Sequence, residues 1–212
     1  MPYVKQQENV NKYSTSILKI KNCIEFSILK KFYSNDQLLE FKSEEITNNY
    51  FFYRTAGGRY WKVIQTKETG TGTVSEKKVH LNNLSSYEAV CILSSSLFWW
   101  YYSCHYDMFN LKDYMIFGFR ISNISESDSE LLINLGKKYV KSLEENAVIK
   151  TVNSKTKGNI EQKQYIVKKS KPIIDEIDKI LAKHYGFTDE ELDYIINYDI
   201  KYRMGSELEE DE

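Results

Sequence analysis

Hydrophobic residues in the first third of the chain fall in short runs that favour strands. The segment 16–32, SILKIKNCIEFSILKKF, alternates loosely between Ile, Leu or Phe and polar residues, which predicts one or two strands. The polar segment 36–45 is expected to be helical. Two aromatic, β-branched runs, 49–54 (NYFFYR) and 59–65 (RYWKVIQ), then flank Ala56-Gly57-Gly58. Because glycine accepts the positive φ of a tight turn, this pattern predicts a β-hairpin.

The middle of the chain contains its most hydrophobic segment. A glycine-rich loop and a short strand, VHL (79–81), precede it. Ser85 and Glu88 have the spacing of a capping box, which predicts a helix that continues through AVCILSSSLFWWYY (89–102). Apolar residues occupy nearly every face of this helix, so we expect it to be buried against the sheet, with its two tryptophans in the core. After a loop, MIFGFRI (115–121) is predicted as a strand.

A second capping-box spacing, Ser127 to Glu130, precedes an amphipathic helix, ELLINLGKKYVKSLEE (130–145). Its predicted apolar stripe consists of Leu131, Leu132, Leu135, Tyr139 and Leu143. The following stretch, 146–164, is polar and rich in lysine. It is expected to be a loop with strand pieces and is the best candidate for a linker.

Two further helices are predicted near the end of the chain. Pro172 suits a first helical turn, and Gly186 suits the left-handed position that ends a helix. Thr188 and Glu191 then have the spacing that caps a second, shorter helix. The two helices form a predicted helical hairpin, which is too acidic to lie along phosphates and is expected to close the fold or to dock on a catalytic domain.

These elements together predict an α+β fold: a mixed or antiparallel sheet with a buried helix packed on it, plus the C-terminal helical hairpin. We divide the chain into an α+β domain (1–150), a lysine-rich linker (151–170), the helical hairpin (171–204) and an acidic tail (205–212). The tail is expected to be disordered.

The formal net charge of −1 conceals segregated charge. Without the tail SELEEDE, 29 basic residues face 25 acidic ones, a balance of +4. Ten lysines face three glutamates between Lys137 and Lys171, and six cations face two glutamates between Arg54 and Lys78. Such blocks favour an anionic partner, because neutralising phosphates releases counterions. A lysine-rich solvated surface is the alternative.

Cellular location is indicated by the cysteines and by the lack of a signal peptide. Cys23, Cys91 and Cys104 are odd in number and have no CxxC spacing, and the latter two lie in apolar surroundings that suggest buried thiols. We therefore expect a reducing, cytoplasmic setting. The longest apolar run is interrupted by three serines, so no segment reaches transmembrane length.

Catalytic patterns are weak. Asp36, Glu40 and Lys42 superficially suggest a metal-dependent nuclease, but the spacing is short and charged residues make up 28% of the chain, so chance matches are expected. Cys104 and His105 are adjacent and would point apart. No metal-ligand spacing is found, so we predict no catalytic residue, no metal site and no cofactor site in this chain.

Three segments carry a resemblance to a known family. The block 170–205, SKPIIDEIDKILAKHYGFTDEELDYIINYDIKYRMG, resembles the end of large bacterial adenine-specific N-6 DNA methyltransferases, the type II and type IIG restriction–modification enzymes of the Eco57I-like group. FFYRTAGGRYWK (51–62) and SSSLFWWYY (94–102), which FNLKD follows, resemble their target-recognition (specificity) region. The resemblance covers the chain from about Tyr50 to Gly205.

The departure from that family is as informative as the match. The family's Asn/Asp-Pro-Pro-Tyr motif binds the flipped adenine, and a glycine-containing loop binds S-adenosylmethionine. Pro2 and Pro172 are the only prolines, so no Pro-Pro occurs, and the FxGxG loop is missing. The resemblance therefore implies a DNA-binding target-recognition part, with S-adenosylmethionine bound by a separate methyltransferase catalytic domain or subunit.

The resemblance also implies which residues meet double-stranded DNA. Arg54 and Arg59 would read guanine through bidentate hydrogen bonds, and nearby lysines would hold phosphates. The predicted DNA-binding residues are Arg54, Thr55, Gly57, Gly58, Arg59, Tyr60, Trp61, Lys62, Lys67, Lys77 and Lys78. The alternative for this hairpin is an ordinary β-turn whose arginines face water or pair with acids. The alternative for the whole chain is a non-enzymatic protein-interaction subunit or remnant of such a system.

Overall fold

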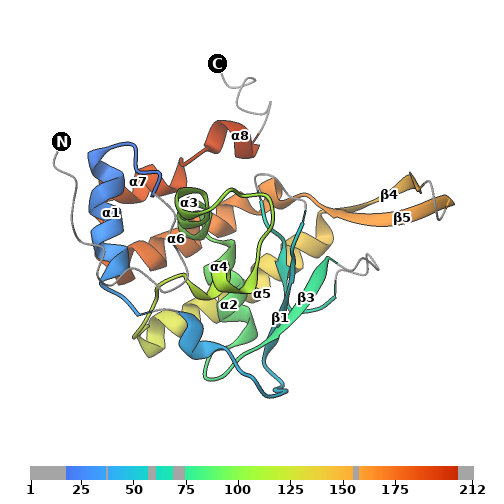
Figure 1. Cartoon of the computed structure of the whole chain (residues 1–212), viewed down its shortest axis with the longest axis horizontal. Coiled ribbons are helices and arrows are strands. Elements are labelled where there is room, and N and C mark those ends of the chain that lie inside the picture. Colours follow the sequence, from blue (N-terminus) through green and yellow to red (C-terminus); the bar gives the residue numbers. More distant parts are fainter. Residues whose placement is uncertain (1–17, 37, 57–60, 69–74, 155–157, 205–212) are drawn as a thin grey trace.

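The computed structural model describes residues 18–36, 38–56, 61–68, 75–154 and 158–204, which form the α+β fold expected from the sequence (Figure 1). The helices are α1 (Cys23–Tyr33), α2 (Ser86–Ser94), α3 (Ser96–His105), α4 (Asp113–Phe117), α5 (Glu126–Glu145), α6 (Lys171–Tyr185), α7 (Asp189–Ile196) and α8 (Ile200–Met204), with 3-10 helices η1 (Leu38–Phe41) and η2 (Val167–Ser170). The strands are β1 (Tyr50–Arg54), β2 (Ile64–Gln65), β3 (Glu76–His80), β4 (Ala147–Ser154) and β5 (Gly158–Tyr165). Within the described segments, no helix combines the length and the hydropathy needed to cross a membrane.

A three-stranded antiparallel sheet with the strand order β2-β1-β3 contains the predicted hairpin strands. Phe52 lies opposite Gln65 and Tyr53 opposite Ile64, so the predicted pairing of the two aromatic runs is confirmed. The second run contributes only two residues to the ladder, because β2 begins at Ile64. The glycine pair of the predicted turn, Gly57-Gly58, lies outside the described residues.

The predicted buried helix is present, but it is two helices. At Ser95 the backbone is extended (φ −65°, ψ 157°), and its hydroxyl caps α3 by accepting a hydrogen bond from the amide of Phe98 at 3.0 Å. A side-chain oxygen at such a position offers the amides a partner that competes with helix continuation. All ten residues of α3 are buried, and Trp99 and Trp100 are core residues as predicted.

Two strand predictions are wrong. Residues 23–33 of the first segment form helix α1, which begins where the side chain of Asn22 accepts a hydrogen bond from the amide of Glu25. Its buried residues include Ile28, Leu29 and Phe32, a helical spacing that loose alternation concealed. Residues of the predicted strand 115–121 belong in part to α4, whose Met115 and Ile116 amides bond the carbonyl of Lys112.

Helix α5 begins earlier than predicted. Ser125, not Ser127, is the N-cap, and its hydroxyl accepts a hydrogen bond from the amide of Asp128. Leu132, Tyr139 and Leu143 of the predicted stripe are buried, Leu135 is half-buried and Leu131 is 51% exposed. The stripe is therefore narrower than the sequence suggests, and it packs mainly against α2.

The helical hairpin of α6 and α7 is confirmed. Pro172 lies in the first turn of α6, and Gly186 ends that helix in the left-handed region at φ 66°. Thr188 and Glu191 form the reciprocal capping box predicted for α7. Helix α6 packs against α2, α3 and α5, so the hairpin closes the helical side of the core.

Residues 146–164, predicted as a loop with strand pieces, are largely strand. β4 and β5 pair antiparallel over eight residues each, from Ala147 opposite Tyr165 to Ser154 opposite Gly158. We call this two-stranded unit the ribbon. Figure 1 shows that the ribbon extends from the end of α5 away from the rest of the molecule. The described residues of the segment expected as a linker, 151–154 and 158–170, thus contain the end of β4, all of β5 and the 3-10 helix η2.

Candidate functional site

The predicted DNA-binding residues start at the end of β1. Arg54 is half-buried and lies opposite Glu76 of β3, while its Nε is buried without a hydrogen-bond partner among the described residues. Thr55 ties the end of β1 to the residue before β3, since both its amide and its hydroxyl donate to the carbonyl of Ser75, at 2.7 and 3.0 Å. Gly57, Gly58, Arg59 and Tyr60 lie outside the described residues.

Two of the predicted phosphate contacts, Lys77 and Lys78, are exposed on β3, an outer strand of the sheet. Consecutive strand residues point to opposite faces, so the side chains of these two lysines extend from opposite faces of β3. The ammonium of Lys78 lies 3.8 Å from the ring centroid of Tyr50. Lys77 lies 3.7 Å from a carboxylate oxygen of Asp113, on the side where Tyr53 is buried.

Lys67 lies after β2 and is also exposed, 3.8 Å from Glu144 at the end of α5. The carboxylate of Glu144 connects the ribbon to the sheet. It forms an ion pair with Lys163 and accepts hydrogen bonds from the Tyr165 hydroxyl at 3.0 Å and from the Gln65 side-chain amide at 3.4 Å. Burial alone would raise the pKa of Glu144, but the bonds from Lys163 and Tyr165 outweigh it and lower that pKa. The base of the ribbon is thereby fixed to the edge of the sheet.

Trp61 and Lys62 point into the molecule. The indole of Trp61 donates a hydrogen bond to the carbonyl of Arg203 at 2.9 Å, and the guanidinium of Arg203 lies 3.9 Å from the Trp61 ring. Lys62 is buried, with its ammonium 3.4 Å from the carbonyl of Met108, and burial lowers its pKa although Asp107 opposes the shift. Both residues therefore hold the β1–β2 connection to the rest of the fold.

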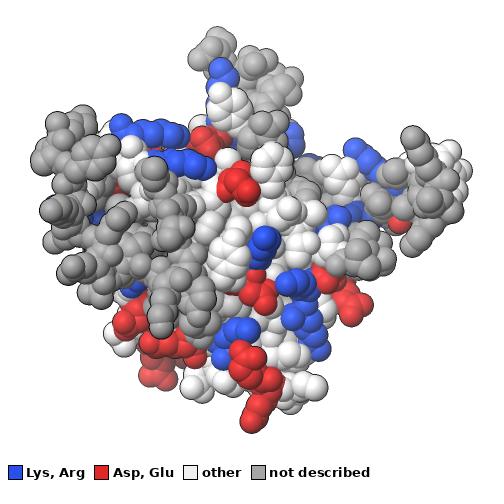
Figure 2. All heavy atoms as spheres, in the orientation of Figure 1, with Lys and Arg blue, Asp and Glu red and all other residues white. Residues whose placement is uncertain are grey.

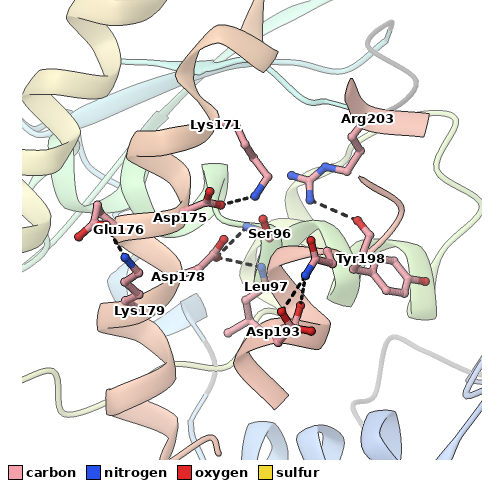
Figure 3. A network of polar contacts seen from close by, with 11 residues as sticks. Ser96, Leu97, Lys171, Asp175, Glu176, Asp178, Lys179, Asp193, Tyr198 and Arg203 are labelled. Atoms are coloured by element: carbon pink, nitrogen blue, oxygen red, sulfur yellow. Dashed lines mark hydrogen bonds and ion pairs between the residues drawn. The ribbon is translucent and has the colours of Figure 1, made fainter. Parts of the chain in front are cut away.

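A buried ionic network lies behind this connection (Figure 3). Asp178 of α6 accepts hydrogen bonds from the amides of Ser96 and Leu97 at the start of α3, at 2.9 and 3.4 Å. Burial raises the pKa of Asp178 to about 6, although Ser96, Arg203 and Lys171 oppose the shift. Burial likewise lowers the pKa of Arg203 to about 10, against the attraction of Asp178.

Each of these charges has a local reason to be there. Asp178 faces the N-terminus of a helix, where free amides and the helix dipole favour an anion. Arg203 brings a planar cation onto an aromatic ring, which suits a guanidinium better than an ammonium. The network joins α3, α6 and α8 and offers no nucleophile to solvent, so its role is to position the C-terminal helices.

On the face shown in Figure 2, the described side chains carry mixed rather than uniform charge. Blue side chains are visible along the ribbon on the right and around the lower centre of the view, where red side chains lie between them. Several lysines are paired with acids, among them Lys42 with Glu44 and Lys183 with Asp128. On the face that Figure 2 shows, the basic side chains therefore form local patches between acidic ones.

Other candidate chemistry finds little support. His105 bonds the Tyr33 hydroxyl and the carbonyl of Tyr101, and burial lowers its pKa to about 4. Burial raises the pKa of the neighbouring Cys104 thiol to about 12, so neither residue is an accessible acid, base or nucleophile. Over the described part of the chain, no three His, Cys, Asp or Glu side chains are placed to hold a metal ion.

Two groups of residues stand out in the structure but not in the sequence patterns. The first group is the exposed residues of the ribbon, and the second is the buried pair of Asp178 and Arg203. The sequence of the ribbon shows no alternation of apolar and polar residues that would predict strands, because polar residues dominate both of its strands. No protein-family model, curated protein or solved structure matches the chain.

Proposed function

We propose that this chain binds double-stranded DNA as the target-recognition part of an adenine-N6 DNA methyltransferase or restriction–modification system, without catalytic motifs of its own. The observation that carries the proposal is the exposure of Lys77 and Lys78 on the outer strand β3, beside the end of β1 where Arg54 and Thr55 lie. The resemblance of residues 50–205 to such enzymes supports the same conclusion.

The β3 edge of the sheet, which carries Lys77 and Lys78, suits phosphate groups. The Lys78 ammonium is held over the ring of Tyr50, which restricts it without neutralising its charge. Lys77 is 51% exposed at its side chain and is paired with a half-exposed carboxylate, a contact that contributes little in water and that a phosphate can replace. Two lysines at one strand edge set position and affinity along a duplex rather than base sequence.

Base reading would fall to Arg54 and Arg59. Arg54 is the described member of this set, and a guanidinium that reaches a guanine edge forms two parallel hydrogen bonds. Trp61 and Lys62 anchor the chain just before β2, since their polar atoms bond Arg203 and Met108. Their place in the proposal is therefore to position the neighbouring base-reading residues.

The catalytic partner would supply methyl transfer. In the proposal a separate methyltransferase domain or subunit in the bacterial cytoplasm binds S-adenosylmethionine and the flipped adenine. The helical hairpin of α6 and α7 is acidic and would face that partner rather than DNA.

The test is fluorescence anisotropy of a labelled 30-bp duplex with the full chain at several salt concentrations. If lysines contact phosphates, the logarithm of the association constant falls linearly with the logarithm of salt, by roughly 0.9 for each phosphate. The double variant Lys77→Ala, Lys78→Ala should weaken binding to every duplex and reduce the salt slope by roughly 2.

The matched control is Lys179→Ala, which removes an exposed lysine of α6 that is paired with Glu176. It should leave both affinity and salt slope unchanged. Absence of duplex binding by the wild-type chain at low salt would refute DNA recognition and would favour a protein-interaction subunit.

A further inference from the structure

The ribbon exposes side chains on both of its faces. Ile149, Lys150 and Thr151 are consecutive residues of β4, so they alternate between the two faces, and all three are exposed. Ile149 is 70% exposed and Val148 is 40% exposed. A strand pair normally buries one face against a core, and an isolated pair of strands is marginally stable in water. We therefore expect a binding partner to cover at least one face of the ribbon.

Charge favours an anionic partner for the ribbon. From Ala147 to Ser170 the sequence contains six lysines and a single acid, Glu161. Lys150 is exposed on the ribbon, and Lys169 is exposed on η2 near its base. A protein strand that adds to the ribbon edge would not need this charge, whereas a polyphosphate backbone would.

Shape and hydrogen-bonding chemistry favour the major groove of a duplex. Eight residues of strand extend about 26 Å, and the major groove admits a two-stranded ribbon. Asn153 and Asn159 lie directly opposite each other in the ladder and are both exposed. Directly opposed residues point to the same face, and an asparagine amide, like that of glutamine, can pair with both the N6 and N7 positions of adenine.

The base of the ribbon is held firmly enough to aim it. Glu144 binds Lys163 and Tyr165 of β5 and also Gln65 and Lys67 from the sheet. The ribbon and the β2 edge of the three-stranded sheet are thus fixed to one carboxylate, while Lys77 and Lys78 lie on β3, the other outer strand of the same sheet. A duplex that contacts Lys77 and Lys78 would then meet the ribbon in a defined orientation, which reduces the ordering cost of binding.

We propose that the β4–β5 ribbon inserts into the DNA major groove, where Asn153 and Asn159 recognise adenine and Lys150 contacts phosphate. The inference rests on the proposed function, because it assumes that the chain binds duplex DNA. It adds a second recognition element to the loop between β1 and β2 and assigns that element a base.

The experiment compares two labelled 30-bp duplexes, one of A·T pairs and one of G·C pairs, by anisotropy with the full chain. We expect the wild type to prefer the A·T duplex. The double variant Asn153→Ala, Asn159→Ala should lose that preference, weakening A·T binding by roughly 5- to 160-fold while G·C binding changes little. Lys150→Ala should weaken binding to both duplexes and lower the salt slope by about 1.

Matched controls are Asn134→Ala on α5 and Lys30→Ala on α1, which remove an exposed amide and an exposed lysine outside the ribbon. Equal circular dichroism and unfolding midpoints establish that all variants fold. If the wild type binds DNA and the ribbon variants match it, the inference is refuted while the proposed function stands. If the wild type binds no duplex, both fail. Loss of a dimer in light scattering of the ribbon variants, without loss of DNA binding, would assign the ribbon to a second copy of the chain.

Discussion

Replacing Asp178 with Asn should change how the stability of the protein depends on pH. Asp178 is 2% exposed, its Oδ1 accepts hydrogen bonds from Ser96 and Leu97, and its Oδ2 has no hydrogen-bond partner among the described residues. Burial without full compensation disfavours the charged carboxylate, which raises its pKa from 3.8 to about 6 despite the nearby Arg203 and Lys171. Asparagine keeps the shape and an acceptor for the amides but cannot titrate.

The magnitude follows from the gap between the two pKa values. At about 1.4 kcal/mol for each pH unit, a rise from 3.8 to about 6 corresponds to roughly 3 kcal/mol. Because the folded-state pKa of this group is raised, its contribution to stability is fully present below pH 3.8 and is lost as pH rises through 6. The free energy of unfolding of D178N, minus that of the wild type, should therefore increase by about 2.4 kcal/mol between pH 4 and pH 7, most of the full range of roughly 3 kcal/mol.

The assay is urea unfolding followed by tryptophan fluorescence at intervals between pH 4 and pH 7.5. Taking the difference between variant and wild type removes every titration that the two proteins share. The matched control is Asp193→Asn, an exposed carboxylate of α7, whose difference from the wild type should stay within about 0.5 kcal/mol at all pH values. A D178N difference that is equally flat would refute the reasoning that Asp178 is buried and charged at neutral pH.

Three further predictions concern the core. Burial lowers the pKa of His105 from 6.5 to about 4, so the free energy of unfolding decreases as pH falls below 6.5. The variant His105→Gln should remove about 3 kcal/mol of that decrease, measured by urea unfolding. An unchanged dependence on acid pH would contradict this prediction. Gly136→Ala should lower the unfolding temperature although alanine favours helices by about 1 kcal/mol, because its Cβ would lie 2.3 Å from the carbonyl oxygen of Tyr87; a higher temperature would contradict that. Trp100→Ala should cost about 3–5 kcal/mol of unfolding free energy, against about 0.5 kcal/mol or less for the exposed Leu131→Ala, and equal losses would contradict the core assignment.

Elements with strong local signals were predictable from the sequence. The left-handed glycine at 186 and the capping box at Thr188 fix the ends of two helices through contacts within a few residues. The aromatic runs of β1 and β2 likewise determined their own pairing, although not the length of β2. In each case the information lies in neighbouring residues, so no knowledge of the tertiary structure was needed.

Elements with competing signals were not predictable. Ser95 and Ser125 are N-caps within serine-rich stretches, where several serines had suitable spacing and only packing selects one. The sequence of helix α1 predicts strands instead, because Asn22, its N-cap, falls in the middle of an alternating segment. Local patterns of this kind permit two structures, and burial of Ile28 and Phe32 decides between them.

The candidate site was predictable only where exposure follows from charge. Lys67, Lys77 and Lys78 are exposed, as expected for phosphate contacts, but Lys62 of the same basic block is buried against carbonyl oxygens. Its burial depends on the Met108 carbonyl, which no pattern around position 62 specifies. The sequence predicts only strand pieces within a loop where the ribbon lies, because a strand pair with two solvent faces lacks the apolar alternation by which strands are identified.

The contact between Trp61 and Arg203 also has a consequence for folding kinetics. It joins residues that are 142 positions apart, and closing a loop of that length costs roughly 4 kcal/mol of chain entropy beyond the constant term. We therefore expect it to form after the rate-limiting step, on a core that is already assembled. Interactions absent from the transition state govern the unfolding rate and not the folding rate. We therefore expect the contact between α8 and the β1–β2 connection to slow unfolding. When α8 dissociates from that connection, the connection should become accessible to proteases before the core unfolds.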